Sequence, residues 1–262
     1  MTSKTMSHLL MKIENGVMEL TLNRPEALNS FSPELIQGLK SALQQAKADK
    51  DIRVIVLKGA GRAFSSGGDV KRMGSRSPIA TYEHIGNLNE LILLIQSVEK
   101  PIIAAVHGYA AGAGFNLALA CDLILAEEET KFILSFSKVG LISDGGGSYF
   151  LPRLVGLQRA KELLFSAEPL TVEKAYEFGI VNHIYKKGHF EDDVKQYAEK
   201  LSAGPNIAYG FIKKLTNESY QLSLKQVLEQ ERITQGTMVT TEDHHEGITA
   251  FKEKRQPDFK RS

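Results

Sequence analysis

The stretch "PIIAAVHGYAAGAGFNLALACD" (residues 101–122) decides the fold of this sequence. It begins with an uninterrupted apolar run, which is typical of a strand buried on both faces. The segment YAAGAG follows, and its glycines permit a tight turn into FNLALACD, whose pattern predicts a helix. A buried strand that turns through glycines into a helix is typical of α/β proteins, so we expect a mostly parallel sheet covered by helices.

The same order of strand and helix recurs on both sides of this stretch. Strand patterns lie at residues 17–22 and 53–59, and a helical pattern that starts with Ser32 and Pro33 lies between them. The later predicted elements are a strand in 131–137, a loop around Asp144, a helix from about residue 156 and a strand in 179–185. From residue 189 the pattern is helical almost to the end. We therefore expect an α/β core over residues 1–188 and a helical region over 189–262.

Composition narrows the class of protein. The chain has 262 residues, of which 42% are hydrophobic, and this is enough for a full core. Its 32 basic and 31 acidic residues are balanced, which argues against nucleic acid or an acidic macromolecule as partner. Cys121 is the one cysteine in the sequence, which excludes an internal disulfide and a cysteine-based metal cluster and fits a reducing cytoplasm. With no apolar run near the roughly 20 residues that span a bilayer, we expect a soluble, cytoplasmic protein.

Two glycine loops follow predicted strands, FSSGGD (64–69) and AAGAGF (110–115). Where such a loop enters a helix, unpaired backbone N–H groups favour negative charge, although the glycines could also serve only close helix packing. A dinucleotide site is disfavoured, because Leu117 stands where the third glycine of that fingerprint belongs. Two N–H donors from two loops suit an oxygen that gains charge during a reaction, such as that of a thioester enolate.

Six motifs follow one another along essentially the whole chain: LNRPEALNSF (22–31), GRAFSSGGDVKRM (61–73), EKPIIAAVHGYAAGAGFNLALACD (99–122), KFILSFSKVGLISDGGGSYFLPRLVG (131–156), TVEKAYEFGIVN (171–182) and GITAFKEKRQPDF (247–259). Together they resemble the enoyl-CoA hydratase/isomerase, or crotonase, superfamily. The resemblance implies a crotonase (ClpP-like) α/β spiral of ββα units and a helical C-terminal trimerisation region. It also implies a homotrimer or dimer of trimers that binds a coenzyme A thioester as substrate, with no separate cofactor and no metal.

The resemblance further implies a set of binding residues. The backbone N–H groups of Gly68 and Ala113 become the two oxyanion donors. Arg24, Ala27 and Leu28 become candidate contacts to coenzyme A, although Arg24 could equally be an ordinary exposed arginine after a strand. The remaining candidate substrate contacts are Ser66, Asp69, Val70 and Phe136, and either Lys254 or Arg255 is a candidate contact to a neighbouring subunit's ligand.

The carboxylates decide the expected reaction. A typical hydratase of this family has glutamates where this chain has Asn116 and Phe136, and neither side chain acts as an acid or a base at neutral pH. Phe136 instead adds an apolar wall, which raises the pKa of a nearby carboxylate. Asp144 matches the proton-shuttling aspartate of dienoyl-CoA and ring-1,2-epoxyphenylacetyl-CoA isomerases, although an Asp before glycines is also a common turn.

Asp144 also matches the nucleophile of 4-chlorobenzoyl-CoA dehalogenase. That enzyme has a tryptophan where Phe136 stands, and this sequence contains none, so dehalogenation ranks lower. We predict an isomerase that shifts a 3-enoyl-CoA double bond, or isomerises 1,2-epoxyphenylacetyl-CoA, in fatty acid or phenylacetate catabolism. The alternatives are an enoyl-CoA hydratase and a noncatalytic crotonase-fold protein that binds acyl-CoA or RNA.

Overall fold

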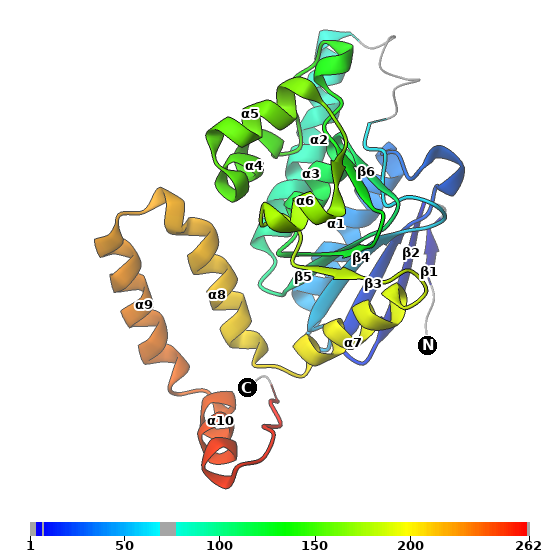
Figure 1. The fold of residues 1–262 in the computed structure, drawn as a ribbon. Helices are drawn as coiled ribbons and strands as arrows, with labels where there is room; N and C mark the ends of the chain where they lie inside the picture. The colour runs from blue at the N-terminus through cyan, green and yellow to red at the C-terminus, as the bar shows by residue number, and fades with distance from the viewer. Residues whose placement is uncertain (1–3, 7, 69–76, 261–262) are drawn as a thin grey trace.

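A seven-stranded sheet forms the centre of the molecule (Figure 1). The computed structural model describes residues 4–6, 8–68 and 77–260. The strands are β1 (Lys4–Met6), β2 (Leu9–Glu14), β3 (Val17–Leu22), β4 (Val54–Gly59), β5 (Ile102–Val106), β7 (Leu123–Glu127) and β10 (His183–Tyr185), in this order across the sheet. From β3 to β10 all neighbours are parallel, whereas β1, β2 and β3 pair antiparallel. The predicted, mostly parallel sheet is therefore confirmed.

A second, three-stranded sheet lies beside the first. Its strands are β6 (Tyr109–Ala111), β8 (Lys131–Ile133) and β9 (Leu170–Thr171), with β8 parallel to β6 and antiparallel to β9. Part of the segment YAAGAG, which the sequence predicts as a loop, is therefore the strand β6. Isolated bridges join Ser65 to Ala110 of β6 and Gly68 to Phe31, so the first glycine loop lies between β6 and the segment that precedes α1.

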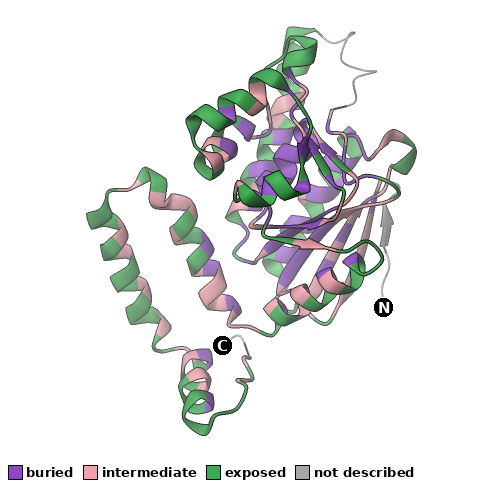
Figure 2. Cartoon of the chain, viewed as in Figure 1, coloured by how far each residue is buried: buried purple, intermediate pink, exposed green. Residues whose placement is uncertain are grey.

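The helices of the body are α1 (Pro33–Ala48), α2 (Pro78–Ser97), α3 (Ala113–Leu119), α4 (Gly147–Val155), α5 (Leu157–Ser166), α6 (Val172–Glu177) and α7 (Phe190–Ser202), with short 3-10 turns η1 (Pro25–Ala27) and η3 (Ser137–Val139). One face of the large sheet packs on a core that includes α1, α2 and α3, and the other face packs on α7. The buried residues accordingly gather in the sheet and its adjoining helix faces (Figure 2).

Three further helices form an arm that projects from the body (Figure 1). They are α8 (Asn206–Glu218), α9 (Leu224–Met238) and α10 (Glu242–Glu253), with η4 (Ser219–Gln221) between the first two. Because α7 packs on β3, β4 and β7, the first helix after residue 189 lies on the α/β body. The division at residue 188 stays a prediction.

Local sequence explains most of these elements. Helix α1 begins as predicted, with the Ser32 hydroxyl accepting a hydrogen bond from the Leu35 N–H and Pro33 in the first turn. Asn15 and Gly16, both with left-handed backbone, turn β2 into β3. The helix expected from about residue 156 is confirmed as α5, which begins at Leu157. Helix α4, which begins at Gly147, is not predicted from the sequence. The helix expected directly after FSSGGD falls on positions outside the described residues, and the next described helix begins at Pro78.

Candidate active site

The two glycine loops meet at Gly67. A Cβ atom at this position would lie 2.7 Å from the Ala113 nitrogen and 2.8 Å from the Gly114 nitrogen, and the backbone φ of Gly67 is +78°. Both the close approach and the left-handed backbone therefore require glycine. This contact brings the Gly68 N–H and the Ala113 N–H, which come from separate loops, to one place. Neither donates a hydrogen bond to an acceptor in the described part of the chain.

Phe136 borders this place. A Cβ atom at Gly112 would lie 3.7 Å from the tip of the Phe136 ring, so the ring lies against the residue that precedes the Ala113 donor. Phe136 is 8% exposed and belongs to the main hydrophobic core, as Ala113 does. The predicted apolar wall thus lies beside one of the two predicted donors.

The segment RPEALNS forms the other side of the first loop. The Ser66 N–H donates to the Leu28 carbonyl at 2.8 Å, and the Ser66 hydroxyl donates to the Ala27 carbonyl at 3.4 Å. Leu28 has a left-handed φ of 50°, which the buried side chain of Asn29 helps to hold by donating to the Ala60 and Ala63 carbonyls. Ala27, Leu28 and Ser66 therefore lie together, and their contact with substrate stays a prediction.

Arg24 is held by its own loop. Its Nη1 donates to the Ser30 carbonyl at 2.6 Å and to the Ser30 hydroxyl at 3.1 Å. Its Nε is buried and has no hydrogen-bond partner among the described residues. The guanidinium is thus oriented by its own loop, and a fixed guanidinium is a suitable partner for a phosphate oxygen.

Asp144 lies in the loop before α4 and contacts Asn116, which lies one helical turn after Ala113 on α3. Asn116, which is on α3, donates from Nδ2 to the Asp144 carbonyl at 2.7 Å and to the Ser143 hydroxyl at 2.9 Å. The Gly147 N–H donates to the same Asp144 carbonyl at 3.1 Å. These bonds fix the peptide of Asp144, whereas its carboxylate Oδ1 is buried with no partner among the described residues.

The environment of Asp144 suits a base. Burial raises the pKa of this carboxyl from 3.8 to about 6, and a hydrogen bond from its own backbone N–H opposes this only in part. No charged side chain of the described residues contributes to the shift. A carboxylate of this pKa is ionised at neutral pH and still basic enough to accept a proton from carbon activated by a thioester.

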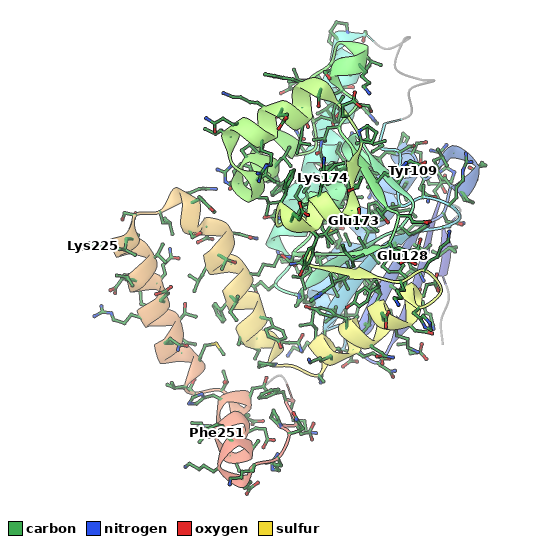
Figure 3. All side chains as sticks on the ribbon, in the orientation of Figure 1. Tyr109, Glu128, Glu173, Lys174, Lys225 and Phe251 are labelled. Atoms are coloured by element: carbon green, nitrogen blue, oxygen red, sulfur yellow. The ribbon has the colours of Figure 1, made fainter. Side chains whose placement is uncertain are left out.

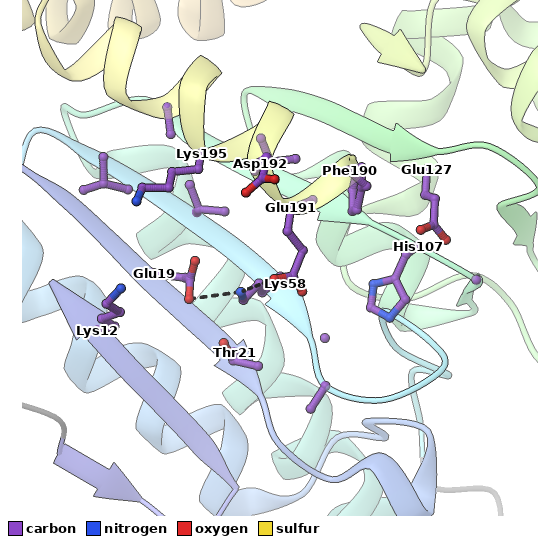
Figure 4. A pocket seen from close by; sticks show the side chains of 18 of the residues that line it. Lys12, Glu19, Thr21, Lys58, His107, Glu127, Phe190, Glu191, Asp192 and Lys195 are labelled. Carbon is purple, nitrogen blue, oxygen red and sulfur yellow. Dashed lines mark ion pairs between the residues drawn. The ribbon is translucent and has the colours of Figure 1, made fainter. Parts of the chain in front are cut away.

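A separate groove of about 1060 Å³ lies on the other face of the large sheet, under α7 (Figure 4). Val56 and Ala105 line it, and both belong to the hydrophobic cluster on the α7 face rather than to the core that holds Ala113 and Phe136. At its centre Lys58 pairs with Glu19 at 3.0 Å and with Glu191 at 4.0 Å. Lys58 is therefore already paired with carboxylates of the protein itself, and the groove lies on the opposite face of the sheet from the core that holds Ala113 and Phe136.

The remaining predicted residues have different outcomes. Asp69 and Val70 lie outside the described residues. In the terminal motif, the Arg255 guanidinium pairs with both carboxylate oxygens of Glu246 and with Glu253, whereas Lys254 is exposed. Lys254 is therefore the better candidate for a contact with another subunit's ligand.

Some supporting side chains were not predicted. Ser65 is fully buried, and its hydroxyl donates to the Asn29 carbonyl while accepting from the Gly67 N–H. Ser65 and Asn29 together tie the segment RPEALNS to the first glycine loop. Their signal in the sequence is a polar residue inside each motif, which does not distinguish a buried support from a group that contacts ligand.

The described residues contain no group of three or more His, Cys, Asp or Glu side chains that could hold a metal ion. Within the same part of the chain, no helix has both the length and the apolar character needed to cross a membrane. What the site offers is two backbone donors, an apolar wall and one carboxylate of raised pKa. In an α/β spiral, this set defines a class of enzyme suited to stabilising an enolate.

Comparison with known proteins names the family. The model of the Enoyl-CoA hydratase/isomerase family matches residues 12–262. The 1,2-epoxyphenylacetyl-CoA isomerase of Escherichia coli (strain K12) is 38% identical over 259 residues, which cover 97% of this chain and 98% of that protein. The 2,3-dehydroadipyl-CoA hydratase of the same organism is 36% identical over 255 residues, with coverage of 97% and 99%.

Solved structures support the same family assignment. An enoyl-CoA hydratase from Bacillus anthracis superimposes with a TM-score of 0.94 at 30% identity, over 98% of this chain and all of that one. The fold is therefore the α/β crotonase fold with C-terminal helices, as predicted. The chain belongs to the enoyl-CoA hydratase/isomerase, or crotonase, family of acyl-CoA enzymes.

Proposed function

We propose that this enzyme isomerises unsaturated acyl-CoA thioesters, moving a 3,4 double bond to the 2,3 position or isomerising 1,2-epoxyphenylacetyl-CoA, with Asp144 as the base. The observation that carries the proposal is the buried carboxylate of Asp144, whose pKa is raised to about 6 and whose Oδ1 has no partner among the described residues. Its backbone carbonyl is bound by Asn116, which lies one helical turn after the Ala113 donor on α3. The likeness to the 1,2-epoxyphenylacetyl-CoA isomerase of Escherichia coli supports the same choice.

The proposed reaction needs one carboxylate. Asp144 removes a proton from C2 of a 3-enoyl-CoA, and the thioester oxygen gains negative charge as the dienolate forms. The N–H groups of Gly68 and Ala113 stabilise this oxygen, each contributing about 2.7 to 4 kcal/mol in comparable sites. The protonated Asp144 then returns the proton to C4, which gives the conjugated 2-enoyl-CoA and restores the carboxylate.

Hydration is the less favoured of the two candidate reactions. Adding water to a 2-enoyl-CoA requires groups that hold and deprotonate a water molecule. Asn116 uses its amide N–H groups on the protein's own loop, and Phe136 carries no polar atom on its side chain. The hydratases among the relatives keep this reading open to test.

An absorbance assay separates these readings. We expect a 3-enoyl-CoA incubated with the enzyme to gain the absorbance of a conjugated thioester, because its double bond moves next to the carbonyl. A 2-enoyl-CoA should keep its absorbance. If the 2-enoyl-CoA loses absorbance and the 3-enoyl-CoA does not react, the enzyme is a hydratase. If neither aliphatic substrate reacts, turnover of 1,2-epoxyphenylacetyl-CoA distinguishes an aromatic isomerase from a noncatalytic protein.

We also propose that the enzyme is a homotrimer or a dimer of trimers assembled through its helical arm. None of the 15 described residues of α9 is buried, although a helix without a packed face has little stability of its own. Exposed apolar side chains follow the arm: Leu224, Leu228 and Ile233 on α9 and Ile248 and Phe251 on α10. An apolar pocket of about 640 Å³ lies beside them, between the start of α8 and α10.

A charge on this surface should prevent assembly. Phe251 projects from α10 and is 86% exposed in the single chain (Figure 3). We expect Phe251→Glu to lower the mass measured by light scattering from a multiple of 28.9 kDa to that of one chain. The matched control is Phe165→Glu, which changes an exposed phenylalanine on α5 and should leave the mass unchanged. A wild-type enzyme that is monomeric would contradict the proposal directly.

A further inference from the structure

Asn116 is a buried polar residue to which the proposed reaction assigns no step. It is fully buried on α3, and its Nδ2 donates to two acceptors of one loop, the Ser143 hydroxyl and the Asp144 carbonyl. Its Oδ1 is buried with no partner in the described part of the chain. The opposite orientation of the amide would place Oδ1 against the Asp144 carbonyl, where two acceptors repel each other. The Asp144 carbonyl, which can only accept, therefore decides the orientation of the amide.

Glycines next to Asn116 leave room for the contact between its amide and the loop of Ser143 and Asp144. A Cβ atom at Gly147 would overlap both the Asn116 amide and the Ser143 hydroxyl, so only glycine at position 147 lets the amide reach the loop. Gly145 and Gly146 both have left-handed backbone, with φ of 55° and 86°. Gly145 and Gly146 therefore turn the chain after Asp144, and Gly147 leaves room for the Asn116 amide.

We propose that Asn116 is a positioning residue, whose amide holds the Asp144 peptide so that the carboxylate keeps its orientation toward the substrate. The inference rests on the proposed role of Asp144 as base. The inference follows from which atoms of Asp144 accept hydrogen bonds. Asn116 and Gly147 occupy the backbone carbonyl of Asp144 and leave the carboxylate Oδ1 unpartnered. A donor to the carboxylate would lower its basicity, whereas a donor to the peptide fixes its direction without that loss.

The experiment compares Asn116→Ala with the wild-type enzyme. We expect kcat for 3-enoyl-CoA isomerisation to fall by about 10²-fold, the scale of a misplaced catalytic group, with KM unchanged. Released from the amide, the loop should expose the carboxylate to water. The midpoint of the Asp144 carboxyl carbon resonance in an NMR titration, assigned with Asp144→Asn, should then fall from about 6 toward the usual aspartate range.

Asn206→Ala is the matched control. Asn206 is also a buried asparagine whose Nδ2 donates to two carbonyls, those of Ser202 and Gly204, and whose Oδ1 has no partner among the described residues, but it lies at the start of α8. We expect this variant to lose stability while keeping kcat and the Asp144 titration. If it changes both in the way that Asn116→Ala does, the effect is general loosening and the inference is wrong.

A second variant and the choice of NMR as the measurement keep the inference testable. Gly147→Ala retains the amide but displaces it, and should reproduce the shifted titration even if Asn116→Ala does not fold. An unchanged Asp144 titration midpoint and unchanged kcat in both variants would overturn the inference. Because the NMR titration needs no substrate, it tests the role of Asn116 even if the wild-type enzyme fails to isomerise enoyl-CoA, in which case only the proposed function is lost.

Discussion

Asp144→Asn should abolish isomerisation and, at pH 7, make the protein more stable. Asparagine fills the same space but cannot accept the proton, so we expect kcat to fall by about 10² to 10⁴-fold, the usual contribution of a general base. Binding of an unreactive acyl-CoA analogue should persist, because the donors on Gly68 and Ala113 are backbone groups. Equilibrium binding and turnover, measured on the same preparation, separate the two effects.

The stability gain follows from the pKa of Asp144. Burial raises it from 3.8 to about 6, so the folded protein holds this proton more tightly than the unfolded chain does. The contribution is complete below pH 4 and is lost as pH rises to 6, where the folded carboxyl ionises. At pH 7 the buried carboxylate costs at most about 3 kcal/mol, at 1.36 kcal/mol per pKa unit, and asparagine removes that cost.

Unfolding by urea at pH 7 and pH 4 measures this difference. The advantage of Asp144→Asn should be present at pH 7 and should largely vanish at pH 4, where the wild-type carboxyl is protonated. In the wild type, kcat/KM should fall tenfold per pH unit below about 6. Asp51→Asn, at an exposed loop position, is the control and should leave activity and stability unchanged. Full activity of Asp144→Asn would exclude Asp144 as the base.

Regular periodicity accounts for the elements that the sequence predicts well. The Ser32 and Pro33 start and the apolar face of α1 are local signals, and the structure follows them. Helix α4 is missed because Gly146 precedes it, Gly147 begins it and Pro152 lies inside it, which are all signals against a helix. Tertiary packing overrides them, since Leu151 of this helix is fully buried.

The sequence predicts site residues well where a backbone group acts, because the motif itself marks the position. It predicts them less well where one side chain holds another residue in place. The resemblance to the family motifs assigns the donor roles to Gly68 and Ala113, and a backbone donor needs only the local turn. That Asn116 would hold Asp144 depends on a contact across 28 residues, which no spacing rule supplies. The same limit applies to Lys213, which lies in the helical pattern of the arm and, as one of two adjacent lysines, resembles a solvent-exposed residue.

Lys213 is instead a buried residue that fastens the arm to the body. Its Nζ donates to the Asp122 carboxylate at 2.9 Å, to the Ile95 carbonyl at 2.9 Å and to the Lys100 carbonyl at 3.4 Å. Lys213 belongs to α8, whereas its three acceptors belong to the body. Burial raises the pKa of Asp122, and Lys213 opposes that rise. The pair therefore places a buried carboxylate against a buried ammonium where α8 meets the sheet.

Lys213→Met should lower the free energy of unfolding by about 3 to 5 kcal/mol, the typical result of leaving one member of a buried ion pair without its partner. The exposed neighbour gives a matched control, since Lys214→Met should change stability by less than about 0.5 kcal/mol. The loss should shrink as pH falls, because the abandoned Asp122 can then take up a proton.

The double variant Lys213→Met with Asp122→Asn separates charge from packing. If the loss comes from the uncompensated carboxylate, the double variant should recover most of the stability, and the two changes should be strongly nonadditive. The Ile102 N–H would still have an acceptor, because the asparagine oxygen can replace Oδ2 of Asp122. Additive losses would show that Lys213 acts mainly through its carbonyl contacts. The arm would then be held by the ends of α2 and β5 rather than by charge.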